Sequence, residues 1–158
     1  MSMRRTARFS TLMLALLIVL LDQFSKAWVL VSLPEGVTRR WLPGLLDLQL
    51  VFNRGAAFSL FTQAQTLLAL ISAIVTLVLL GWVWRQQGLN VAQTAAVGLL
   101  LGGTIGNGID RWRMGAVVDF LRLVPFEFPV FNVADVAINL AVACFAFDLL
   151  SRTRSDAR

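Results

Sequence analysis

The part of the sequence that decides the fold runs from Thr104 to Asn139 and reads TIGNGIDRWRMGAVVDFLRLVPFEFPVFNVADVAIN. It lies between two long apolar runs, yet it holds four of the nine acidic residues of the chain. Charges are costly in membrane segments, at about 2.5–3.5 kcal/mol each on insertion scales. Such a cluster therefore indicates a functional site. Its acidic residues are Asp110, Asp119, Glu127 and Asp135.

The composition of the whole chain is that of a membrane protein. Hydrophobic residues make up 58% and charged residues 15% of the 158 residues, and the mean hydropathy is +0.75. A soluble domain has about 45–50% apolar and about 25% charged residues. Four stretches are long enough to cross a bilayer as helices of about 20 residues. We therefore predict an all-α membrane protein that forms one integral membrane domain, residues 1–158, with crossings at residues 10–31, 66–84, 91–110 and 132–150.

A small β-sheet is predicted on the outer face, between the first two crossings. Residues 46–52 (LDLQLVF) alternate in polarity as a β-strand does, and Pro and Gly residues before them mark turns. An open strand edge cannot lie in lipid, so we expect a sheet on the membrane surface, paired with part of residues 116–123. This prediction places β structure within residues 34–63 and an outer loop at residues 111–131.

The net charge of +5 comes from thirteen arginines and Lys26. The arginines flank apolar segments, which suits orientation signals and lipid head groups, so no nucleic-acid partner is expected. Seven basic residues fall on each side of the predicted topology, and their number therefore does not decide the orientation. The clusters at the two ends of the chain stand free beside the first and last crossings. We therefore predict that both termini are cytoplasmic.

Histidine is absent from the chain. This excludes Ser–His and Cys–His dyads, histidine-rich zinc sites and the HExxH motif. The single cysteine, Cys144, lies inside the last apolar run, so no internal disulfide is possible. We predict neither a metal nor a cofactor.

Four carboxylates are predicted to collect at the outer ends of the crossings: Asp22, Asp110, Asp119 and Asp135. Two aspartates about 3 Å apart share a proton and titrate as a coupled pair. One can take a proton from water while the other protonates the carbonyl oxygen under attack, without metal or histidine. We therefore predict that Asp119 and Asp135 form the catalytic pair of a membrane aspartic peptidase, with Asn132 as the N-cap of the last helix.

Five motifs of the sequence resemble those of the bacterial lipoprotein signal peptidases, also called signal peptidase II. In chain order they are DQFSK (22–26), NRGAAF (53–58), GGTIGNGIDR (102–111), VVDF (117–120) and FNVADVAI (131–138). The resemblance covers nearly the whole chain and implies that Asp119 and Asp135 are catalytic. It also implies that nine other residues support the site or hold substrate: Asp22, Lys26, Asn53, Gly55, Asn107, Asp110, Arg111, Asn132 and Ala134.

The resemblance further implies a function and a location. Members of this family cleave a signal peptide just before a cysteine that carries a diacylglyceryl group, at the outer face of the bacterial inner membrane. The expected partners are the lipid-modified preprotein and membrane lipids. Nothing in the sequence demands a partner chain, so we expect a monomer.

Other interpretations stay open from the residues alone. A small four-helix exporter would bind protons and cations at its carboxylates, but it needs a key acid near the middle of the bilayer. A serine–lysine hydrolase could use a deprotonated Lys26, although Ser25 points about 100° away on a helix. A purely structural membrane protein would leave the clustered acids unexplained. The Asp110–Arg111 and Asp22–Lys26 pairs could also serve structure alone.

Overall fold

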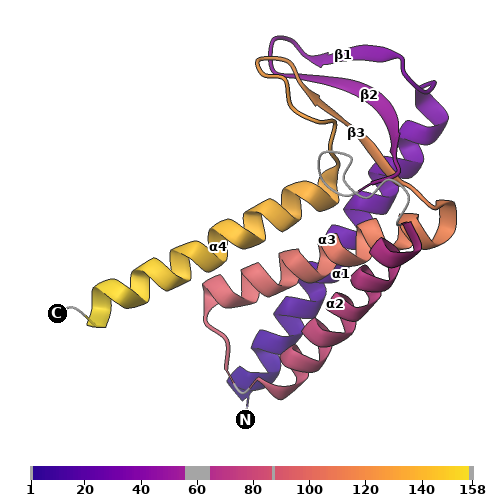
Figure 1. The fold of residues 1–158 in the computed structure, drawn as a ribbon. Helices are drawn as coiled ribbons and strands as arrows, with labels where there is room; N and C mark the ends of the chain where they lie inside the picture. Colours follow the sequence, from indigo (N-terminus) through magenta and orange to yellow (C-terminus); the bar gives the residue numbers. More distant parts are fainter. Residues whose placement is uncertain (1, 56–64, 87, 157–158) are drawn as a thin grey trace.

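The computed structural model describes residues 2–55, 65–86 and 88–156. Figure 1 shows helices with a small sheet at one end; α1 begins and α4 ends far from that sheet. The helices are α1 (Ser2–Ser32), α2 (Gln65–Arg85), α3 (Val91–Met114) and α4 (Val133–Asp156). The strands are β1 (Thr38–Leu42), β2 (Leu46–Asn53) and β3 (Val117–Leu123).

Three helices in the described part of the chain are long and apolar enough to cross a membrane. They span Thr6–Ser32, Gln65–Arg85 and Val133–Thr153 and match the first, second and fourth predicted crossings. The third predicted crossing forms as α3, but it is not among these three. α3 packs against all three other helices, and most of its buried residues are small or polar. A helix enclosed in this way exposes little surface to lipid, and the third predicted crossing, at residues 91–110, stays a prediction.

Glycine at every fourth position lets α1 lie directly against α3. A Cβ atom added at Gly98, Gly102 or Gly106 would come within 3.0 Å of atoms of α1. Gly103 plays the same part for α4, since a Cβ there would lie 2.6 Å from the carbonyl oxygen of Ala134. Small residues permit such close approach of membrane helices. The packing brings α1 and α4 together beside the end of α3 that faces the sheet.

The sheet is antiparallel and has the order β1-β2-β3. β2 pairs with β3, which confirms the predicted pairing of residues 46–52 with part of 116–123. Leu48 and Leu50 of β2 share a buried core with Val118 and Phe120 of β3 and with Val29 near the end of α1. This core fixes the sheet on the end of α1. Within the predicted β-containing segment, residues 56–64 lie outside the described part of the chain.

The connection after α3 is tighter than the predicted loop of residues 111–131. α3 continues to Met114, and Gly115 ends it with a φ of 66°, a left-handed conformation that favours glycine. β3 begins two residues later at Val117. The predicted loop began at residue 111 because the apolar run ends there. The helix instead continues through a polar last turn to Met114. The tight turn carries Asp119 back over the end of α3.

Candidate active site

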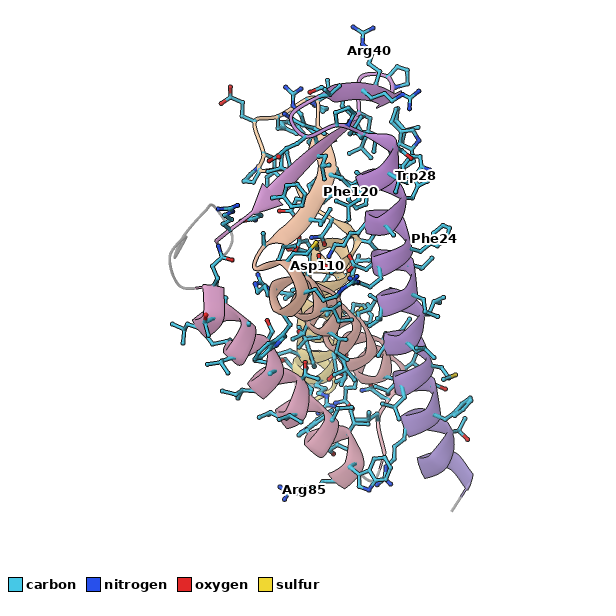
Figure 2. The ribbon with its side chains drawn as sticks, turned by 90° about the vertical axis from the view of Figure 1, so that its right-hand side faces the viewer. Phe24, Trp28, Arg40, Arg85, Asp110 and Phe120 are labelled. Carbon is cyan, nitrogen blue, oxygen red and sulfur yellow. The ribbon has the colours of Figure 1, made fainter. Side chains whose placement is uncertain are left out.

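A buried lysine holds two aspartates together where α1 and α3 meet. Lys26 Nζ lies 2.8 Å from Asp22 Oδ2 and 2.8 Å from Asp110 Oδ2, and no side chain of the three is more than 3% exposed. Figure 2 shows Asp110 inside the molecule between the sheet and the helices, whereas Phe24 points outward from α1. We call Asp22, Lys26 and Asp110 the Lys26 cluster.

The Lys26 cluster does not suit a serine–lysine hydrolase. Besides its two carboxylate partners, Lys26 Nζ donates to Asn107 Oδ1 at 3.0 Å, so all three of its donors are engaged. Ser25 Oγ donates to the backbone oxygen of Asp22 at 2.8 Å. The lysine therefore presents no free lone pair, and the neighbouring serine is turned to its own helix.

Gln23 is a member of the site that the sequence analysis missed. Its Nε2 atom lies within hydrogen-bond distance of Asp22 Oδ2 at 3.2 Å, of Asp110 Oδ1 at 3.0 Å and of the carbonyl oxygen of Gly106 at 3.2 Å. The signal available was a polar residue inside an apolar helix, next to a charged one. Gln23 thus ties both carboxylates of the Lys26 cluster to the backbone of α3.

Asp119 lies on β3 and is 2% exposed. Its Oδ2 atom accepts a hydrogen bond from Asn53 Nδ2 on β2 at 2.9 Å, and its Oδ1 atom accepts one from Asn132 Nδ2 at 2.6 Å. Burial, and after it the charge of Asp135, raises the pKa of Asp119 from 3.8 to about 7. The two hydrogen bonds and the charge of Lys26 oppose this rise. Asp119 can therefore hold a proton near pH 7, where an ordinary aspartate is ionised.

Asp135 lies in the first turn of α4 and is half-buried. Its backbone N–H donates to Asn132 Oδ1 at 2.9 Å, and its Oδ2 atom accepts from the backbone N–H of Asn132 at 3.2 Å. This reciprocal pair is a capping arrangement at the helix start, and it confirms Asn132 as the N-cap. The helix dipole favours a negative charge at this end of α4.

Two asparagines connect the predicted catalytic aspartates. Asn132 Nδ2 donates to Asp119 Oδ1 and also to Asn107 Oδ1, the latter at 3.0 Å. Asn107 Nδ2 then donates to Asp135 Oδ1 at 2.8 Å. A continuous hydrogen-bonded path therefore leads from β3 through α3 to α4, and the structure brings Asp119 and Asp135 to one place.

Both aspartates face a cavity of about 750 Å³ between α2, α3, α4 and β3. Asn53, Asn107 and Arg111 are its other main polar groups, and the rest of its wall is mostly apolar. Arg111 Nη1 lies 3.4 Å from both Ser72 Oγ and the carbonyl oxygen of Asn107. Within the described ranges, Arg111 has no carboxylate within 4.0 Å. The cavity thus joins acids, one cation and an apolar wall.

The other predicted supporting residues lie behind the cavity wall. Asp22, Lys26 and Asp110 form the buried cluster described above, and Asn132 caps α4. Gly55 and Ala134 take part through their backbone: Gly55 N–H donates to Asn53 Oδ1 at 3.0 Å, and Ala134 N–H donates to Asp22 Oδ1 at 3.0 Å. These six residues therefore hold the site together and are absent from the cavity lining.

Metal ligands are not grouped in the part of the chain that the structure describes. No three or more histidine, cysteine, aspartate or glutamate side chains are placed there to hold a metal ion. The chemistry that the residues can perform is acid–base chemistry by two carboxyl groups, one of which has a pKa near neutrality.

Comparison with known proteins identifies the family of the chain. The family model described as signal peptidase (SPase) II matches residues 14–151. The lipoprotein signal peptidase of Synechococcus sp. (strain RCC307) is 54% identical over 144 residues, which cover 90% of this chain and 95% of the relative. That of Gloeobacter violaceus is 43% identical over 147 residues, 91% of this chain and 85% of the relative.

A solved structure of a bacterial membrane enzyme superposes with a TM-score of 0.84 at 28% identity, covering 90% of this chain and 88% of that one. A second such structure gives a TM-score of 0.80, also at 28% identity, over 89% of this chain and 92% of the other. Sequence and fold therefore point the same way. The chain belongs to the signal peptidase II family of membrane peptidases.

Proposed function

We propose that the chain removes signal peptides from bacterial prolipoproteins, cleaving just before the diacylglyceryl-modified cysteine, with Asp119 and Asp135 as the catalytic pair. The observation that carries this proposal is the shared cavity. Its wall holds two aspartates, each of which accepts a hydrogen bond from an asparagine, and apolar side chains surround them. An apolar wall suits a lipid-bearing substrate, and the acid pair suits hydrolysis of an amide.

The environments of the two aspartates support different roles for them. Asp119, whose pKa is raised to about 7, carries the proton. Asp135, at the positive end of the α4 dipole, is the carboxylate. Asp135 takes a proton from water as the water oxygen bonds to the scissile carbonyl carbon, and Asp119 gives its proton to the carbonyl oxygen. Collapse of this tetrahedral species breaks the C–N bond, the proton held by Asp135 passes to the departing nitrogen, and one hydroxyl proton of the tetrahedral species returns to Asp119 as the carboxylic acid product forms.

Several contacts at the end opposite the sheet support the predicted topology. Arg8 Nη2, near the start of α1, donates to the carbonyl oxygen of Gln86 after α2 at 2.7 Å. Asn90, at the start of α3, donates to Asp148 of α4 at 2.6 Å. The start of α1 thus lies beside the end of α2, and the start of α3 lies beside the Asp148 turn of α4, all away from the sheet (Figure 1).

We therefore propose four crossings in one domain, with both termini in the cytoplasm. The sheet and the active site then face the periplasmic side of the inner membrane. Membrane lipids and the lipidated precursor are the proposed partners of a monomer.

The test is cleavage of a diacylglyceryl-cysteine precursor by the purified protein in detergent. Asp119→Asn and Asp135→Asn should each abolish release of the signal peptide. Both variants should remain folded, with the thermal unfolding temperature of the wild type. Glu127→Gln is the matched control, since Glu127 is exposed and lies outside the cavity lining; it should cleave at the wild-type rate. Normal turnover by either aspartate variant would refute the pair.

A further inference from the structure

We infer that the Lys26 cluster positions both members of the acid pair by holding the backbone N–H of the residue before each one. Asp22 Oδ1 accepts a hydrogen bond from Ala134 N–H at 3.0 Å, and Ala134 directly precedes Asp135. Asp110 Oδ2 accepts one from Val118 N–H at 3.2 Å, and Val118 directly precedes Asp119. This inference rests on the proposed function and adds a cause for the geometry of the pair.

One ammonium group is the common reference for both contacts. Lys26 Nζ lies 2.8 Å from the carboxylate that holds α4 and 2.8 Å from the carboxylate that holds β3. The distance between a strand of the outer sheet and the first turn of a helix is thereby set through a single nitrogen atom. A displacement of about 1 Å in such a site can cost about 100-fold in rate.

The contacts lie where water cannot replace them. Ala134 and Val118 are both fully buried, and the Lys26 cluster is buried with them. Ala134 is the second residue of α4, where a backbone N–H has no partner inside the helix. Asp22 therefore satisfies a donor that would otherwise be unpaired within the helix, and loss of this contact leaves a buried N–H without an acceptor.

The Lys26 cluster also reaches the side chain of Asp135. Lys26 Nζ donates to Asn107 Oδ1, and this fixes the orientation of the amide so that Asn107 Nδ2 faces Asp135 Oδ1 at 2.8 Å. Backbone and side chain of Asp135 are thus both oriented by the same cluster. Asp22, Lys26 and Asp110 are absent from the cavity lining, so they are positioning residues and do not touch substrate.

The experiment compares two substitutions of Asp110. Asp110→Ala removes the oxygen that accepts from Val118 N–H. Asp110→Asn keeps an oxygen acceptor at that place and puts an amide nitrogen towards Gln23; like the alanine, it removes the negative charge that faces Lys26. Both variants leave Asp22 and Lys26 as one carboxylate and one ammonium. We expect Asp110→Ala to lower kcat about 100-fold with KM within about twofold of wild type, and Asp110→Asn to lower kcat less than about fivefold.

Two controls isolate the contact. Gln23→Ala should also lower kcat less than about fivefold, because it loses the contacts to Asp110, Asp22 and Gly106 but leaves both backbone N–H contacts of the cluster in place. Asp148→Ala truncates another ion-paired aspartate, which bonds to Arg152 at the far end of α4, and it should keep the wild-type kcat. All rates are divided by the amount of folded protein. That amount is taken from the monodisperse fraction in detergent, and thermal unfolding shows that this fraction is folded.

Equal kcat values for Asp110→Ala and Asp110→Asn, at either a high or a low level, would overturn the inference. A rise in KM at unchanged kcat would overturn it as well. Wild-type cleavage and the inactivity of Asp119→Asn test the proposed function separately. Failure of positioning and failure of the peptidase assignment are therefore distinct results.

Discussion

Replacing Asn53 with alanine tests whether Asp119 is the member of the acid pair that carries the proton, because Asn53 affects the pKa of Asp119. Asn53 Nδ2 donates to Asp119 Oδ2 at 2.9 Å and favours the ionised form of this carboxyl group. The pKa of Asp119 is about 7 with this bond in place. Because the substitution removes a donor to the ionised form, it must raise this pKa further.

The size of the shift follows from the energy of the bond. A hydrogen bond to a charged group contributes about 1.5–3 kcal/mol, and about 1.4 kcal/mol corresponds to one pKa unit. The pKa of Asp119 should therefore rise by about one to two units. Asp119 is the proton donor in the proposed mechanism, so activity declines on the alkaline side as it ionises. In Asn53→Ala the alkaline limb should move from about pH 7 to about pH 8–9.

The assay is kcat/KM for a lipidated precursor peptide, measured across the pH range on purified protein in detergent. Asn139→Ala is the control, since Asn139 lines the same cavity but donates to the backbone oxygen of Asp135 in its own helix. Its alkaline limb should coincide with that of the wild type. An alkaline limb in Asn53→Ala that stays in place, or that moves to lower pH, would show that Asp119 is not the group that carries the proton.

Three further predictions concern packing, helix ends and metals. Gly106→Ala should destabilise the fold by about 1–3 kcal/mol, because the added Cβ would lie 2.5 Å from Asp22 Oδ2. Thermal unfolding measures this loss. Gly81→Ala is the control and should show no such loss, because its added Cβ would meet no atom within 4 Å beyond its own stretch of helix backbone. Arg8→Ala should cost about 0.3–1 kcal/mol in the same measurement, because it removes the cation bound to the carbonyl of Gln86, and kcat should not change. Incubation with EDTA should leave the cleavage rate unchanged, and a loss restored by a divalent cation would contradict the metal-free mechanism.

Much of the site could be predicted from local spacing. The i, i+4 relation of Asp22 and Lys26 predicts a contact on one helix face, and the structure shows it at 2.8 Å. The alternation in residues 46–52 predicts a strand, and its pairing with β3 is confirmed. Asn132 before an apolar run predicts a helix cap, and it accepts from Asp135 N–H as a cap does. In each case the signal lies within a few residues.

What could not be predicted depends on contacts between distant segments. No local pattern tells that Asp22 accepts from the backbone N–H of Ala134, 112 residues later. Gln23 lies about 100° around the helix from Asp22, so a helix-face argument excludes it, yet its long side chain reaches both carboxylates. The enclosure of α3 likewise follows from glycines that meet neighbours in three dimensions, and hydropathy alone does not reveal it.

The crowded hydrogen bonding of Asn107 and Asn132 bears on resistance to inhibitors. The Asn107 amide accepts from Lys26 and Asn132 and donates to Asp135, so each of its polar atoms is in use. No other side chain of that length offers one acceptor and one donor in this arrangement. A drug that bonds to the Asn107 amide, which lines the cavity, would contact a residue whose replacement breaks three buried or half-buried hydrogen bonds. Resistance mutations are then expected among the apolar residues that line the cavity. An inhibitor can be designed to make few contacts with those residues.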